Sequence, residues 1–103
     1  MSEPLDVVMN DKTHRFEVRI GEDVAFAEYR FSPDHITLPH TVVPDAFAGK
    51  GVGGALAKAA LGYAREHRLT VKPTCSFMAG YITKHPEYHD LVHPDFGERL
   101  GIR

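Results

Sequence analysis

Cys75 and His40 are the side chains of this sequence best suited to group-transfer chemistry. A thiolate is a good nucleophile toward acyl groups, and exchange between two thioesters is nearly balanced in energy. An imidazole that titrates near neutral pH can take a proton from a thiol or an incoming amine. The pair therefore predicts acyl transfer, provided that the fold brings His40 within hydrogen-bond reach of Cys75 or of the substrate. The alternatives are a small buried hydrophobe at Cys75 and a hydrogen-bonded core histidine at His40.

A glycine-rich run lies between a predicted strand and a predicted helix: Gly49, Lys50, Gly51, Val52, Gly53 and Gly54. Glycines let the backbone approach a ligand closely, and the unpaired N–H groups of a first helical turn point toward it. Together with the helix dipole, these groups favour a phosphate or pyrophosphate. The alternative is a turn that only reverses the chain, but a plain turn does not need so many glycines.

Two better-known phosphate-binding patterns do not fit this run. Gly49, Gly51 and Gly54 match G-x-G-x-x-G, yet no Asp or Glu lies between Glu66 and Glu87, where a dinucleotide fold needs an acid for the ribose. The P-loop pattern fails because no Ser or Thr follows the lysine of the run.

The elements that must position these residues follow from hydrophobic periodicity. Alternation predicts two strands that form an antiparallel hairpin and a third, β-branched strand in which Pro39 indicates a bulge. Alternation also places His40 on the face of Ile36, Leu38 and Val42. A three- and four-residue period then predicts an amphipathic helix from Gly51 to His67. The predicted elements are strands at 14–20, 25–31, 36–43 and 69–71, helices at 51–67 and 77–84, a helical turn from 86, and a loose tail after 94. This order predicts an α+β fold, a sheet with helices packed on it.

Length and charge limit the classes of function. The 103 residues suffice for a single domain, 1–103, and nothing requires more than a monomer. A net charge of −2 without a basic stripe argues against nucleic acid as a partner. No apolar run is long enough to enter a membrane, no secretory signal is visible at the start, and a lone cysteine fits a reducing compartment. We therefore expect a cytoplasmic protein.

The ordered motifs resemble the GNAT-type N-acetyltransferase superfamily, in particular its small single-domain group labelled YjdJ-type. The resemblance runs from Arg15 to Leu91. It rests on Arg15-Phe16-Glu17, Ala27-Glu28-Tyr29, His40-Thr41-Val42-Val43-Pro44 leading into the glycine run, Val71-x-Pro73-x-Cys75-x-Phe77, and His85-Pro86-x-x-Tyr88.

The resemblance implies a mixed, mostly antiparallel sheet flanked by helices, and acetyl-CoA as the co-substrate. Thr41, Val42 and Val43 would hydrogen-bond the pantetheine arm of coenzyme A, and residues 49–54 would hold its pyrophosphate. The resemblance also implies Cys75 as an active-site residue. The superfamily usually opens the loop with Arg or Gln, where this chain has Ala48, so binding would rest on backbone N–H groups, with Lys50 as a helper or a solvated charge.

Several alternatives stay open. Transfer to the amine of a small-molecule or protein acceptor would be direct or pass through an acetyl-cysteine at Cys75, with His40 as base; Tyr81 is a candidate acid for the direct route, or a half-buried ring. The same loop would also serve a non-catalytic module that binds coenzyme A. His85, His89 and His93 have a helical spacing that resembles a metal site, but Pro86 and Pro94 interrupt the helix, so we predict no metal.

Overall fold

The computed structural model describes residues 6–47, 49–97 and 100. Its strands form one sheet in the order β1-β2-β3-β4-β5. Neighbours among the first four strands are antiparallel, and β5 runs parallel to β4 after a crossover through α1. The elements are β1 (Val8–Asn10), β2 (Arg15–Ile20), β3 (Asp23–Phe31), β4 (His35–Val42), η1 (Asp45–Phe47), α1 (Val52–Glu66), β5 (Thr70–Lys72), α2 (Ser76–Lys84), η2 (Pro86–Leu91) and α3 (Pro94–Gly97).

The predicted α+β class and the mostly antiparallel sheet are confirmed. The β2–β3 hairpin has the expected turn, with Ile20 opposite Asp23 and Arg15 opposite Glu28. The strand β1 was not predicted, because its short length gives no readable alternation. The tail was expected to be loose after Pro94, but residues 94–97 form a short helix, with the Phe96 N–H bonded to the His93 carbonyl.

A bulge in β4 changes which of its residues face the core. His40 lies opposite Glu28, but the next pair joins Thr37 to Arg30, so three steps along β4 match two along β3. The bulge that Pro39 indicated is thus present. Beyond it Thr41 lies opposite the fully buried Ala27, and His40 points to the other side of the sheet.

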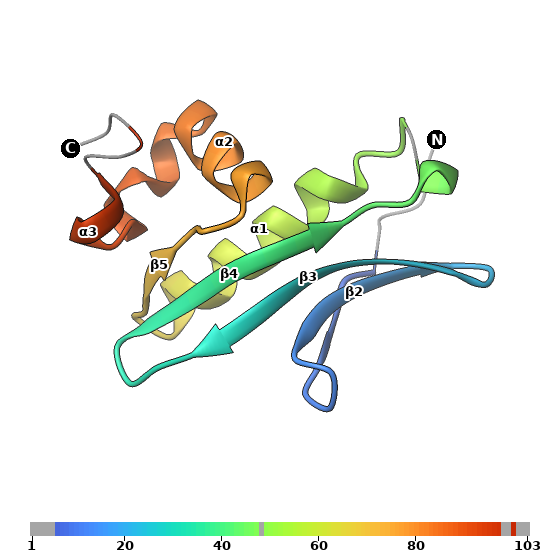
Figure 1. The fold of residues 1–103 in the computed structure, drawn as a ribbon, viewed down its shortest axis with the longest axis horizontal. Helices are drawn as coiled ribbons and strands as arrows, with labels where there is room; N and C mark the ends of the chain where they lie inside the picture. Colours follow the sequence, from blue (N-terminus) through green and yellow to red (C-terminus); the bar gives the residue numbers. More distant parts are fainter. Residues whose placement is uncertain (1–5, 48, 98–99, 101–103) are drawn as a thin grey trace.

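The helix α1 covers one face of the sheet and forms the core with it (Figure 1). Its buried residues recur with the predicted helical period, and a fully buried leucine such as Leu56 contributes about 2 kcal/mol. They pack against Phe16, Val18, Ala25, Ala27, Tyr29, Ile36, Leu38 and Val71.

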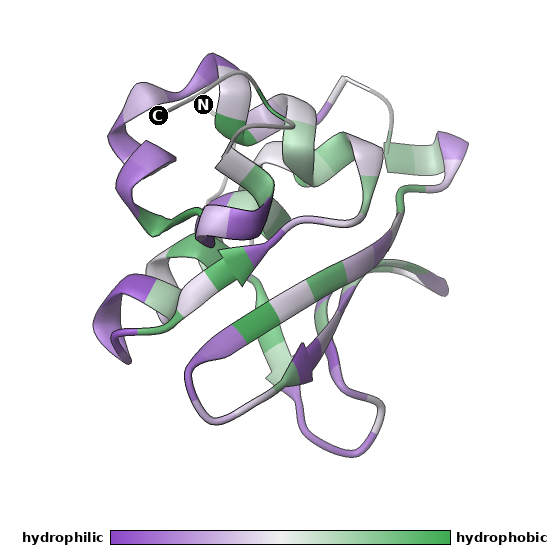
Figure 2. Cartoon of the chain, turned by 60° about the vertical axis from the view of Figure 1, so that its left-hand side comes forward, coloured by the Kyte–Doolittle hydropathy of each residue, from purple (hydrophilic) through white to green (hydrophobic). Residues whose placement is uncertain are grey.

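The other face of the sheet, here called the outer face, has no helix of the described residues over it. Figures 1 and 2 show the helices gathered on the α1 side. The helix α2 and the turn η2 contact α1 and do not cross to the outer face. None of the helices in the described ranges is long and apolar enough to span a bilayer.

Candidate functional site

A cleft opens at the N-terminal end of α1, between that helix and the end of β4. Its volume is about 430 Å³. Most of the predicted coenzyme-binding residues line it, and so do two aromatic residues that the sequence did not single out. The lining residues are Thr41, Val43, Phe47, Gly49, Gly51, Val52, Gly53, Gly54 and Phe77.

The first turn of α1 offers free backbone donors to this cleft. Gly51 is the N-cap, in the left-handed region at φ 70°, and no side chain caps the helix. The first paired amide is that of Ala55, which donates to the Gly51 carbonyl at 3.0 Å. Among the residues the structure describes, the N–H groups of Val52, Gly53 and Gly54 have no acceptor. Such amides and the positive end of the dipole favour an anion here, and the binding of a pyrophosphate stays a prediction.

Gly53 and Phe77 together shape the wall of the cleft. A Cβ at Gly53 would lie 2.8 Å from Cζ of the Phe77 ring. The absence of a side chain at this position therefore lets the ring pack against the first turn of α1. Phe77 was not predicted as a site residue, because only the tertiary fold brings α2 to this end of α1.

Two residues of the predicted coenzyme site, Val42 and Lys50, lie away from the cleft lining. Val42 shares the outer face with His40, since it lies opposite Phe26 in the sheet. Lys50 is exposed, and no ion pair joins it to the described residues. Ala48 lies outside the described residues. Binding roles for Val42 and Lys50 stay predictions.

The edge of β4 that faces β5 is open beside the cleft. β5 pairs only with residues 35–37 of β4, and the Cys75 N–H then donates to the Leu38 carbonyl at 3.0 Å. Beyond Leu38 no described strand pairs with this edge. Figure 1 shows β4 extending past β5 toward the start of α1. An extended ligand with amide groups, such as a pantetheine arm, fits such an edge.

Cys75 lies where β4, the cleft and α2 meet. It is half-buried, and its Sγ lies 3.5 Å from Oγ1 of Thr41, which lines the cleft. Burial raises the pKa of the thiol, but the Thr41 hydroxyl and the backbone amides of Met78 and Phe77 more than offset this effect, so the pKa lies below its ordinary value. Sγ makes no capping hydrogen bond to α2, so the backbone amides lower the pKa of the thiol from a longer distance.

His40 is not brought to Cys75. It is exposed on the outer face, where its ring lies 6.2 Å from that of Phe26. The next residue, Thr41, points to the opposite face and contacts the thiol. The prediction that His40 shares a face with Ile36 and Leu38 is therefore wrong, because the bulge inverts the alternation. A direct hydrogen bond between His40 and Cys75 is absent, and a catalytic role for His40 stays a prediction.

Tyr81 lies outside the cleft lining. Its ring stacks on His85 with centroids 3.9 Å apart, and it is half-buried. Burial raises the pKa of its phenol, and Tyr88 and Glu87 add to the shift. These contacts match the interpretation of a half-buried ring on α2.

The three spaced histidines contact the backbone and a carboxylate rather than one another. Nδ1 of His85 lies 2.7 Å from the Tyr81 carbonyl oxygen, Nε2 of His89 lies 3.0 Å from that of Ile82, and His93 faces Asp95. Within the described ranges, no group of three or more His, Cys, Asp and Glu side chains is placed to hold a metal ion.

Comparison with known proteins decides the family. Residues 15–91 match the model of a family described as GCN5-related N-acetyl-transferase. The chain belongs to this family. The match covers strands β2 to β5, the glycine run and Cys75, and it agrees with the resemblance inferred from the motifs.

Relatives of this GCN5-related chain match it over most of their length. Protein NATD1 of Gallus gallus is 36% identical over 93 residues, covering 87% of this chain and 84% of that protein. Protein NATD1 of Homo sapiens is 33% identical over 96 residues, covering 88% and 85%. The NMR structure of a GCN5-like protein from Staphylococcus aureus superposes with a TM-score of 0.70 at 32% identity, covering 86% of this chain and 88% of that one. The fold of this family member is therefore the small GNAT fold.

Proposed function

We propose that this GCN5-related domain binds acetyl-CoA in the cleft and transfers the acetyl group to the amine of a small-molecule or protein acceptor. The observation that carries the proposal is the set of free amides at the start of α1, which open into a cleft beside the unpaired edge of β4. A diphosphate and an amide-bearing arm joined in one ligand match these two features.

Two segments of the chain bind different parts of the coenzyme. Residues 49–54 hold the pyrophosphate through backbone N–H groups, with Lys50 close to the same charge. Residues 41–43 align the pantetheine arm along the edge of β4. The thioester then lies toward Thr41, and the thiol of Cys75 lies 3.5 Å from the Thr41 hydroxyl.

Cys75 supports a covalent route. Its lowered pKa raises the fraction of thiolate, which attacks the thioester carbonyl. A new carbon–sulfur bond forms at Cys75 as the bond to the coenzyme sulfur breaks, and the coenzyme leaves as a thiolate that takes up a proton. The acceptor amine then attacks the acetyl-cysteine, and Cys75 returns to its starting state.

His40 supports the half of the reaction that involves the acceptor. Its imidazole lies on the outer face and would take the proton of an amine there; such an amine reaches the acetyl group past the open edge of β4, because Cys75 lies on the other side of the strand. The same role serves a direct route, in which the amine attacks the thioester itself. The two routes differ in whether an acetyl-cysteine forms.

Calorimetry with two probes tests coenzyme binding. Acetyl-CoA carries the diphosphate, whereas S-acetylpantetheine has the same thioester arm without it. We expect acetyl-CoA to bind about a hundredfold more tightly, since each hydrogen bond to a charged group is worth about 1.5–3 kcal/mol. No heat with acetyl-CoA, or equal affinity for both probes, would contradict the proposal.

Mass spectrometry then tests the chemistry. Wild-type protein incubated with acetyl-CoA should gain an acetyl group that Cys75→Ala does not gain, and an added primary amine should discharge it. Direct transfer would acetylate the amine without an adduct. Tight binding with neither product would favour the alternative, a module that binds coenzyme A without catalysis.

A further inference from the structure

The outer face carries several charged side chains, and most of them neutralise one another. Arg15, Glu17 and Arg19 project from β2, and Glu28 and Arg30 from β3. They alternate with the buried residues of these strands, so they lie on the side of the sheet opposite α1. Their pairing decides what charge is left for a ligand.

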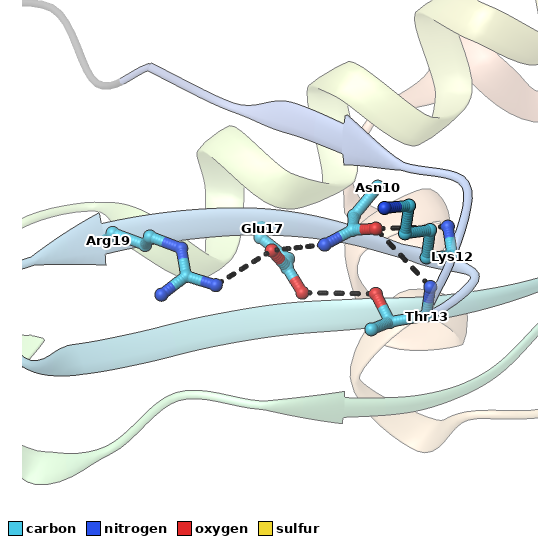
Figure 3. Close-up of polar contacts among 5 residues, drawn as sticks. All are labelled: Asn10, Lys12, Thr13, Glu17 and Arg19. Carbon is cyan, nitrogen blue, oxygen red and sulfur yellow. Dashed lines mark hydrogen bonds and ion pairs between the residues drawn. The ribbon is translucent and has the colours of Figure 1, made fainter.

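The carboxylate of Glu17 is hydrogen-bonded and ion-paired to neighbouring side chains, as Figure 3 shows. Its side chain is only 5% exposed. Asn10 Nδ2 and Thr13 Oγ1 each donate to the carboxylate at 3.2 Å, and the Arg19 guanidinium lies 3.5 Å away. The charges of Glu17 and Arg19 therefore cancel.

Glu28 is likewise engaged, because Arg30 contacts its carboxylate at 3.1 Å. Arg15 lies directly opposite Glu28 but makes no ion pair with any described residue. Its guanidinium carbon instead lies 3.8 Å from the centre of the Phe26 ring. This stacking holds the plane of the guanidinium in place and leaves its N–H groups free to bind an anion.

Arg15 and His40 flank the same aromatic ring. Arg15, Glu28 and His40 lie in one row across β2, β3 and β4. The Arg15 guanidinium carbon lies 3.8 Å and the His40 ring centroid 6.2 Å from the centre of the Phe26 ring, so the guanidinium and the imidazole are at most about 10 Å apart. A free cation thus lies at a fixed distance from the imidazole that the proposed function assigns to the acceptor amine.

We propose that Arg15 binds a carboxylate of the acetyl acceptor, so that the acceptor is a small amine that also carries a carboxylate. This inference rests on the proposed function. A chain of about six bonds between the amine nitrogen and the carboxyl carbon spans roughly 7 Å, the length of two extended residues. A hydrogen bond at one end covers the rest of the distance between Arg15 and His40. The guanidinium binds the carboxylate bidentately while the amine lies at His40.

Three matched amines test the inference in acetyl-transfer assays: 6-aminohexanoate, hexylamine and 1,6-diaminohexane. We expect kcat/KM for 6-aminohexanoate to exceed that for either of the others by about tenfold, the effect of one charge-assisted hydrogen bond. The Arg15→Met variant should reduce this preference to about one. Arg15→Lys keeps the charge without the planar fork, so it should show an intermediate preference even if Arg15→Met is poorly folded.

Arg19→Met is the matched control, because Arg19 lies four residues along the same strand, on the same face, but is paired with Glu17. It should leave the preference unchanged. Equal use of all three amines by the wild type, preference for 1,6-diaminohexane, or the same loss in Arg19→Met would overturn the inference while the proposed function stands. Acetyl-CoA binding without transfer to any amine would overturn the inference and leave only coenzyme binding. Absence of acetyl-CoA binding would instead defeat the proposed function.

Discussion

Two helices meet at the cleft, and they begin in different ways. α1 starts from Gly51 without a side-chain cap, and its first amides have no acceptor among the described residues. α2 starts from Cys75, whose thiol lies close enough to the amides of Met78 and Phe77 for them to lower its pKa. Both starts present the positive end of a helix dipole. At α2 this local field lowers the pKa of a side chain of the protein, whereas at α1 it is open to the coenzyme that we propose there.

The largest expected effect tests the thiol end of this comparison. We expect Cys75→Ala to abolish the acetyl adduct and to lower kcat roughly a thousandfold, because the nucleophile is gone. Affinity for acetyl-CoA should not change, since the free amides belong to α1. Quenched-flow assays and calorimetry measure both. A loss of kcat below about tenfold would show that the amine attacks the thioester directly.

The start of α1, which has no side-chain cap, is tested by the variant Gly53→Ala. In Gly53→Ala the new Cβ clashes with Phe77, whose ring must turn away from α1. Because both residues line the cleft, we expect acetyl-CoA affinity to fall about tenfold, or about 1.4 kcal/mol by calorimetry. The control is Gly54→Ala, whose Cβ would lie 3.8 Å from the Tyr81 ring, an ordinary contact. Equal losses in the two variants would argue against the packing explanation.

Thr41→Val tests how the thiol is tuned. The Thr41 hydroxyl hydrogen-bonds the thiolate, so its loss should raise the pKa of Cys75. A pKa depressed by folding gives stability at pH values above the unfolded pKa, and this stability is lost as the pH falls through the folded value. Because the pKa of the Cys75 thiol should be higher in the variant, the rate of its alkylation by iodoacetamide should reach half its maximum at a higher pH than in the wild type. Coincident profiles would mean that the hydroxyl does not act on the thiol.

The smallest expected effect compares Gly62, which lies within α1, with Gly51, which is its N-cap. Gly62 is exposed in the middle of α1, and nothing lies within 4 Å of a Cβ placed there. Gly62→Ala should raise the free energy of unfolding by about 0.5–1 kcal/mol. Gly51→Ala should lower it by about 1 kcal/mol, because its φ of 70° suits glycine. Chemical denaturation measures both, and a shift of the same sign would contradict this account.

Local signals in the sequence were enough for most of the fold. The helix predicted at 51–67 differs from α1 by one residue at each end, and the β2–β3 hairpin has its expected turn. These elements are readable because periodicity and glycine placement are properties of neighbouring residues. The glycine run was placed correctly at the start of α1 for the same reason.

The parts of the site that depend on distant residues were not readable. The contact of Cys75 with Thr41 joins residues 34 positions apart. Phe77 lines the cleft only because the fold brings α2 to the start of α1. The face of His40 was predicted wrongly, because alternation cannot show on which side of Pro39 the extra residue changes the phase.

That extra residue has a wider consequence. Without it, Thr41 and His40 would exchange sides, and the hydroxyl that contacts Cys75 would face away from the cleft. With it, one strand forms a partition: under the proposed function, the coenzyme is bound on the helix side and the acceptor on the solvent side. Neighbouring positions in this partition can therefore diverge independently, so that relatives could change their acceptor without altering how they hold the acetyl donor.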